Sequence, residues 1–175
     1  MGADLRDLVR SVPDFPKKGI VFRDITTLLK DPAGFARAVD LLTARFAASG
    51  VECVVGIESR GFIVGAALAY RLGSGFVPVR KSGKLPAATL RETYALEYGS
   101  DAVEIHADAI RPGQRVLVHD DLLATGGTIR AACNLVERLG GVIVGVSFLI
   151  ELAFLNGRAR LGSYEVTSLI RYDAE

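Results

Sequence analysis

Short apolar runs alternate with helical patterns along most of the chain from residue 51 onward. The runs are rich in β-branched residues and nearly continuous, which is typical of strands covered on both faces of a sheet. They predict strands over 51–57, 75–79, 115–119 and 141–149, with a weaker strand over 164–170.

The segments between these strands carry helical signals. Asp31 suits an N-cap and Pro32 suits the first helical position, and apolar residues then recur at helical spacing. Helices are predicted over 32–49, 62–72 and 126–139, each followed by a glycine that favours a helix end. Strands that alternate with helices predict an α/β fold with a mostly parallel central sheet and helices on both faces. We expect a single domain over residues 1–175.

Two segments do not follow the alternation. Residues 12–28 contain prolines and few helical signals, and residues 81–105 form a long polar stretch rich in glycine, proline and charge. Long loops in compact domains are usually functional lids or disordered. We therefore expect 81–105 to be a mobile lid loop.

Composition narrows the function classes. The net charge of +1 argues against a non-specific nucleic-acid or membrane-surface binder, which needs a strong basic excess. The N-terminus lacks the apolar core of a signal peptide, and the longest apolar stretch, 141–150, is half of what a membrane span requires. Cys53 and Cys133 lie in apolar runs without metal-ligand spacing, which favours buried, reduced thiols. A cytoplasmic protein is predicted.

The segment 116–128 carries the clearest chemistry. A predicted strand leads into Asp120 and Asp121, and a Gly-Gly pair then opens a helix. Glycines let a backbone approach a ligand closely, and a helix N-terminus offers unpaired N–H groups that suit a phosphate. Carboxylates repel phosphate but accept hydrogen bonds from sugar hydroxyls. The segment therefore predicts a ribose-5-phosphate site. The alternative is a glycine-rich turn with two solvated aspartates.

Other phosphate motifs are absent, since the sequence has neither a G-x-x-x-x-G-K-[ST] run nor a G-x-G-x-x-G turn after a strand. Instead, 116–128 resembles the phosphoribosyl-pyrophosphate signature of the type I phosphoribosyltransferases. Further segments resemble the adenine-specific members of that family, in the same order along 12–152: 13–16, 19–25, 56–62, 80–86 and 96–99. His119 departs from the family, which more often has an apolar residue there. It is expected to pack or hydrogen-bond behind Asp120.

The resemblance implies a purine salvage enzyme with a type I phosphoribosyltransferase fold, a small N-terminal hood over about 1–30 and a lid over about 81–105. It would convert adenine and 5-phosphoribosyl 1-pyrophosphate into AMP and pyrophosphate through an oxocarbenium-like transition state. Mg²⁺ would be carried by the substrate rather than bound directly by the protein, and the chain would form a homodimer. A phosphoribosyltransferase for xanthine or hypoxanthine, and a sensor of phosphoribosyl pyrophosphate without turnover, are the alternatives.

The resemblance also assigns roles near the sugar. Asp120 and Asp121 would accept the ribose hydroxyls, and one of them would stabilise the cationic ring. The 5′-phosphate would lie on the loop Ala124, Thr125, Gly126, Gly127 and Thr128. Arg60, with Ser59, would belong to the pyrophosphate loop, although an ordinary turn with a surface arginine is the alternative.

The remaining roles concern the lid and the base. Arg80, Lys81 and Lys84 would capture pyrophosphate, unless they are merely solvated charges. Glu97 and Tyr98 would cover the reaction centre, where Glu97 would exchange a proton with the purine ring. The hood residues Val21, Phe22 and Arg23 would bind the base, with Leu122 on its other face; the alternative places Phe22 in the core.

Overall fold

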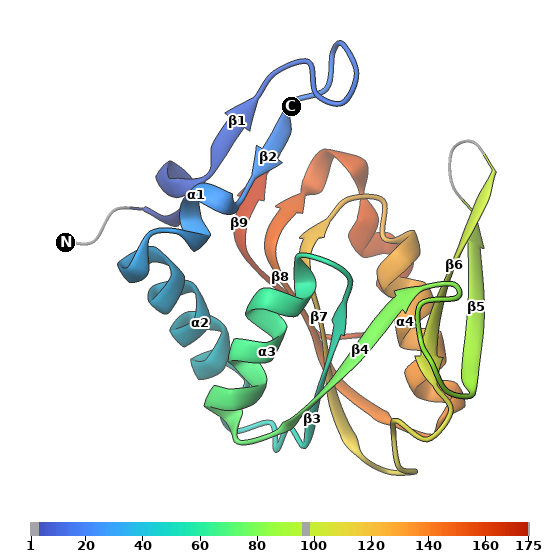
Figure 1. Cartoon of the computed structure of the whole chain (residues 1–175). Helices are drawn as coiled ribbons and strands as arrows, with labels where there is room; N and C mark the ends of the chain where they lie inside the picture. The colour runs from blue at the N-terminus through green and yellow to red at the C-terminus, as the bar shows by residue number, and fades with distance from the viewer. Residues whose placement is uncertain (1–3, 96–98, 175) are drawn as a thin grey trace.

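The computed structural model describes residues 4–95 and 99–174. Its main sheet has seven strands in the order β5-β6-β4-β3-β7-β8-β9 (Figure 1). The strands are β3 (Cys53–Ile57), β4 (Gly75–Lys81), β5 (Thr89–Ala95), β6 (Ser100–His106), β7 (Arg115–Leu123), β8 (Val142–Leu152) and β9 (Val166–Tyr172). β4, β3, β7, β8 and β9 are parallel, whereas β5 and β6 pair antiparallel at one edge. The expected mostly parallel sheet is confirmed.

Helices cover both faces of this sheet, as expected (Figure 1). On one face lie α2 (Pro32–Phe46) and α3 (Gly61–Leu72), and on the other lies α4 (Gly127–Arg138). Every residue of β3 is buried between the two layers, which explains its unbroken apolar sequence. The side chain of Asp31 caps α2 by accepting a hydrogen bond from the N–H of Gly34 at 2.7 Å. No helix in the described part of the chain is both long and apolar enough to cross a membrane.

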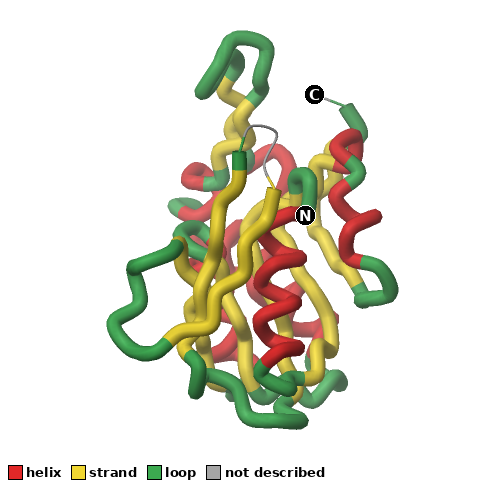
Figure 2. Tube along the Cα trace, turned by 90° about the vertical axis from the view of Figure 1, so that its right-hand side faces the viewer, coloured by secondary structure: helices red, strands yellow, loops and turns green. Residues whose placement is uncertain are grey.

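Residues 81–105 are largely an antiparallel hairpin rather than the loop we expected. β5 pairs with β6 over seven residue pairs, and β6 in turn pairs with the end of β4. Figure 2 shows the two hairpin strands side by side, and α4 packs against both. Glu92 is not a solvated loop acid, because it accepts hydrogen bonds from Asn134 and Arg138 of α4, both at 2.9 Å. The mobility and lid role of this segment stay predictions.

Residues 12–28 also contain more structure than the sequence suggested. A small antiparallel sheet forms from β1 (Arg10–Val12) and β2 (Phe22–Asp24), and α1 (Thr26–Leu29) follows it. The carboxylate of Asp24 links these elements by accepting hydrogen bonds from the N–H of Thr26 and from Arg10. These bonds lower the pKa of Asp24 to about 2. The short elements η1 (Leu5–Leu8), η2 (Ala153–Leu155) and η3 (Gly157–Leu161) are 3-10 turns.

His119 lies in the core of the sheet, and its side chain makes a hydrogen-bonding contact with the neighbouring strand β8. Its side chain is fully buried, and Nδ1 lies 2.9 Å from Oγ of Ser147 on the neighbouring strand β8. Burial disfavours the charged imidazolium and lowers the pKa of His119 to about 3. Cys53 and Cys133 are free and buried, which confirms the expectation of reduced thiols.

This depressed pKa predicts a loss of stability in mild acid. The unfolded chain takes up a proton on His119 below its ordinary pKa of 6.5, whereas the folded chain does not until near pH 3. Stability is thus lost progressively as pH falls through this window, by about 2 kcal/mol between about pH 7 and pH 5 from this residue alone. Denaturant unfolding of the wild type and of His119→Val at both pH values measures the difference. Equal pH dependence in the two proteins would contradict the prediction.

Candidate functional site

The predicted site residues converge where the parallel strands end. The loop 58–60 follows β3, and the glycine-rich loop 124–126 follows β7, so both lie at the carboxyl edge of the sheet. A cavity of about 470 Å³ opens between these loops. Its wall is formed by Ile57, Glu58, Ser59, Arg60, Lys81, Asp120, Asp121, Leu122, Ala124 and Thr128.

The glycine-rich loop forms a smaller hollow beside the main cavity. This hollow of about 70 Å³ is lined by 122–129 together with Asp120. Gly126 has a φ of 83°, a left-handed conformation that suits glycine, and α4 begins at the next residue without a side-chain cap. The first N–H groups of α4 therefore have no partner within the helix and are directed at the loop, which suits a bound anion.

The two aspartates lie within β7 and not after it, because the strand continues to Leu123 instead of ending at His119. Asp121 is 5% exposed, and its carboxylate pairs with Arg60 at 2.7 Å. Asp120 is partly buried, and its Oδ1 accepts a hydrogen bond from the N–H of Asp121 at 2.9 Å. The alternative of two solvated aspartates is therefore wrong.

The two aspartates have different electrostatic surroundings. Burial and then the charge of Asp121 raise the pKa of Asp120 well above its ordinary value. Burial also raises the pKa of Asp121, but the guanidinium of Arg60 opposes this shift. Gly61 brings α3 close to the pair, since a Cβ atom there would lie 2.8 Å from Oδ1 of Asp120. The acid pair is thus packed tightly, with the guanidinium of Arg60 beside Asp121.

The basic residues near the hairpin are paired and not merely solvated. Arg80 and Lys84 both donate to the carboxylate of Glu58, at 2.7 and 2.9 Å. Burial opposes ionisation of Glu58, but the hydrogen bonds from Lys84 and Arg80 outweigh it and lower the pKa of this carboxyl. Lys81 donates to Asp101 and, at 3.3 Å, to the hydroxyl of Tyr94. Sequence reasoning gave no role to Glu58 or Asp101.

The hood residue Phe22 contacts Arg60 of the cavity wall but is not itself among the described residues that line the cavity. Its ring centroid lies 5.2 Å from the guanidinium carbon of Arg60, and its edge meets Phe15. Phe22 is only partly buried and belongs to neither core cluster, so the alternative that places it in the core is wrong. The side chain of Arg23 instead stacks on Tyr172 and donates to Ser11, so any contact of Arg23 with a base would come from its backbone.

Leu122 lines the cavity and also packs against a core cluster. Val21 is partly buried beside Phe22. The predicted residues Glu97 and Tyr98 lie outside the described residues.

Known proteins share both the sequence and the fold. The model of the phosphoribosyl transferase domain family matches residues 25–166. Adenine phosphoribosyltransferase of Acidobacterium capsulatum is 60% identical over 96% of this chain and 93% of its own. The crystal structure of the same enzyme from Thermoanaerobacter pseudethanolicus is 53% identical, with a TM-score of 0.93 over 96% of this chain and 98% of that one.

This chain belongs to the adenine phosphoribosyltransferase family. The resemblance stated from the sequence is confirmed, and with it the fold. A further relative is the Saccharomyces cerevisiae adenine phosphoribosyltransferase, whose structure is a complex with an imino-altritol bisphosphate and adenine. It is 42% identical, with a TM-score of 0.89 over 94% of this chain and 96% of that one.

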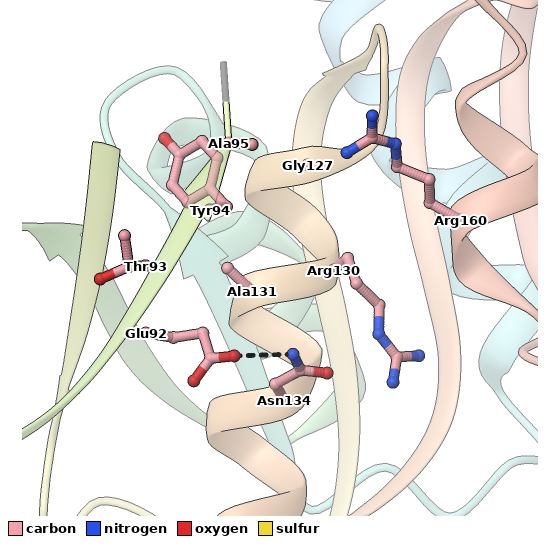
Figure 3. Close-up of a pocket in the computed structure, with 9 residues that line it drawn as sticks. All are labelled: Glu92, Thr93, Tyr94, Ala95, Gly127, Arg130, Ala131, Asn134 and Arg160. Atoms are coloured by element: carbon pink, nitrogen blue, oxygen red, sulfur yellow. Dashed lines mark hydrogen bonds between the residues drawn. The ribbon is translucent and has the colours of Figure 1, made fainter. Parts of the chain in front are cut away.

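A second cavity of about 410 Å³ is lined by residues of β5 and α4 together with Arg160 (Figure 3). Tyr94 and Arg160 both lie near Gly127, and a hydrogen bond joins Glu92 and Asn134, which also line this cavity (Figure 3). The described residues that line it include no member of the acid pair, in contrast to the first cavity.

The pair formed by Arg60 and Asp121 yields a direct prediction. Arg60→Met removes the cation that opposes the effect of burial, so the pKa of Asp121 should rise further in the substrate-free protein. A ¹³C NMR pH titration of labelled aspartate side chains measures this shift. Arg10→Met serves as the matched control, because Arg10 pairs with Asp24 in the hood. An unchanged titration of Asp121 in Arg60→Met would show that the ion pair does not set its charge.

Proposed function

We propose that this chain is a cytoplasmic purine salvage enzyme that converts adenine and 5-phosphoribosyl 1-pyrophosphate into AMP and pyrophosphate, as a homodimer that uses Mg²⁺. The observation that carries the proposal is one cavity that joins the glycine-rich loop, the acid pair and the Arg60 loop. Membership of the family and the adenine bound in a relative's structure support the choice of base.

The sugar phosphate would lie along the end of β7. The N–H groups of loop 124–128 would hold the 5′-phosphate, with the hydroxyls of Thr125 and Thr128 as further donors. The carboxylates of Asp120 and Asp121 would accept hydrogen bonds from the ribose hydroxyls. Their negative charge beside the ring would also stabilise the positive charge that develops on the sugar during transfer.

Pyrophosphate would be held by the basic residues on the other side of the cavity. Arg60 and Ser59 belong to the loop after β3, and Arg80, Lys81 and Lys84 approach from β4 and its end. Each of these four cations has a carboxylate partner in the substrate-free chain. Binding of pyrophosphate would therefore exchange one anion for another, which limits the cost of bringing so many positive charges together.

The cavity also fits Mg²⁺ that arrives with the substrate. Mg²⁺ usually keeps several waters and binds through one or two carboxylates plus substrate phosphates. Asp120 and Asp121 supply carboxylate oxygens at the cavity wall, and we infer that they reach the ion through the ribose and water. When bound, the ion supplies neutralising charge to the pyrophosphate leaving group.

The base would lie between the hood and β7. Phe22 offers a ring face for stacking, and Leu122 would close the opposite face. Backbone groups of Val21 and Arg23 would read the base edge. A carbonyl acceptor suits the 6-amino group of adenine, whereas the 6-oxo group of hypoxanthine or guanine needs a donor.

In the reaction, a ring nitrogen of adenine would form a bond to the anomeric carbon while the bond from that carbon to pyrophosphate breaks. The electron pair of the broken bond would leave with pyrophosphate towards the basic residues. Glu97 would accept the proton that the purine nitrogen loses, and Tyr98 would help the hairpin end exclude water.

Steady-state assays with adenine, hypoxanthine, guanine and xanthine test the proposed function. We expect kcat/KM for adenine to exceed the others by about a hundredfold or more, because a mismatched 6-substituent leaves buried polar groups unpaired. Activity without a preference for adenine would refute the proposed base. Binding of phosphoribosyl pyrophosphate without turnover of any base would support the sensor alternative instead.

We expect Asp121→Asn to lower kcat by about a hundredfold, because it removes negative charge beside the developing cation. The matched control is Asp173→Asn, since Asp173 is an exposed acid that pairs with Arg171. Thermal unfolding of both variants checks the fold. A wild-type rate in Asp121→Asn would remove this aspartate from the mechanism.

For Phe22→Ala we expect a rise in the KM for adenine of about tenfold or more, since base–aromatic stacking contributes about 1–3 kcal/mol. The KM for phosphoribosyl pyrophosphate should change much less. Tyr70→Ala, which removes an aromatic ring that is 86% exposed on α3, should change neither. A larger effect on the sugar substrate than on adenine would refute the hood as the base site.

A further inference from the structure

The turn η3 packs directly behind the glycine-rich loop, although it lies about thirty residues further along the chain. We propose that Gly157, at the start of η3, is a positioning residue for the 5′-phosphate. Its missing side chain lets η3 support the loop from behind at a distance that no other residue would allow. This inference rests on the proposed function, because it takes the loop as the phosphate site.

The closeness of the contact is the main support. A Cβ atom on Gly157 would lie 2.1 Å from the carbonyl oxygen of Ala124 and 3.0 Å from Cδ1 of Leu123. In return, a Cβ atom on Gly126 would lie 2.5 Å from the carbonyl oxygen of Gly157. These neighbours are mostly backbone atoms, which cannot move aside as the end of a flexible side chain can. The backbone near each glycine therefore leaves no room for a side chain at that position.

An ion pair with a buried carboxylate fixes η3 to the sheet. The guanidinium of Arg158 donates to both carboxylate oxygens of Glu151, at 2.9 and 2.7 Å, and to the carbonyl of Val166 at 3.0 Å. Glu151 is 3% exposed and also accepts a hydrogen bond from Ser168. The bonds from Arg158 lower the pKa of Glu151, which keeps the pair charged. A two-bond arginine contact of this kind specifies geometry as well as adding energy.

The same pair connects η3 to the strand that carries the acid pair. Glu151 lies at the end of β8, in register with Leu123 of β7, and the glycine-rich loop begins at the next residue. The loop thus lies between the end of β7, from which it continues, and η3, which contacts its backbone. Its N–H groups gain their direction from this backbone contact, since no side chain caps the start of α4.

An added methyl group at Gly157 would push the carbonyl of Ala124 and rotate the neighbouring N–H groups of the loop. Hydrogen bonds weaken steeply when their angles depart from the preferred range. The cost should therefore fall on ligands that carry a 5′-phosphate. Adenine, which we place at the hood end of the cavity, would not be affected directly.

The test compares Gly157→Ala with the wild type by calorimetric titration of AMP and adenosine and by steady-state kinetics. We expect AMP affinity to fall about tenfold or more, as for the loss of a charge-assisted hydrogen bond. The KM for phosphoribosyl pyrophosphate should rise similarly. Adenosine affinity, or the KM for adenine where adenosine binding is too weak to measure, should change less than about twofold.

Gly75→Ala is the matched control, because a Cβ atom there would meet only the carbonyl of Glu52 at 3.9 Å. It should leave both ligands unaffected. Thermal unfolding shows whether Gly157→Ala folds. If it does not, Arg158→Lys loosens η3 while keeping its charge, and should weaken AMP more than the phosphate-free ligand.

Equal weakening of AMP and the phosphate-free ligand, or no weakening of either, would overturn the role of Gly157. Those outcomes differ from a failure of the proposed function, which would appear as a wild-type protein that neither binds AMP nor turns over adenine.

Discussion

The parallel pairing of β3 with β7 is the constraint on which the site depends. It places Val55 opposite Val118 and Gly56 opposite His119, so the loops that follow the two strands emerge side by side. The ion pair between Arg60 and Asp121 then joins one loop to the end of the other strand. Because both strands are buried between α2–α3 and α4, the core that stabilises the sheet also fixes the distance between these loops.

Charge pairing explains how a nearly neutral protein can gather several basic side chains near one site. The chain carries a net charge of +1, yet two basic side chains, Arg60 and Lys81, line the cavity. Two more, Arg80 and Lys84, pair with the carboxylate of a cavity-wall residue. Glu58, with a side chain only 9% exposed, partners two of them at once. A buried charge without a partner is costly, so Arg80 and Lys84 compensate for the burial of the Glu58 carboxylate.

Local signals in the sequence were enough to predict the five parallel strands of the sheet, the helices that cover it and the glycine-rich loop. Unbroken apolar runs predict the strands β3 and β7, and the helix cap at Asp31 can be predicted from the residues next to it. The hairpin was missed because β5 alternates between partly buried and exposed residues that are mostly polar. That composition favours a loop unless the partner strand and α4 are already known.

Contacts between segments that are distant in the sequence could not be predicted, for a different reason. Glu58 meets Arg80 across 22 positions, and nothing in either neighbourhood specifies the other. The role of Gly157 depends on the backbone path of a loop about thirty residues earlier, so its own sequence context carries no signal. We expected His119 to pack or hydrogen-bond behind Asp120 because the two are adjacent in the sequence. Successive strand residues, however, point to opposite faces of a sheet.

The length of β7 explains how one strand can serve the core and the site together. His119 contacts Ser147 within the sheet, while the residues that follow line the cavity at the sheet edge. The acid pair is fixed through its backbone by β8, and the glycine-rich loop is fixed through its backbone by η3. Main-chain contacts therefore support the strand and the loop of the site, whereas its charged side chains pair with one another, as Arg60 does with Asp121.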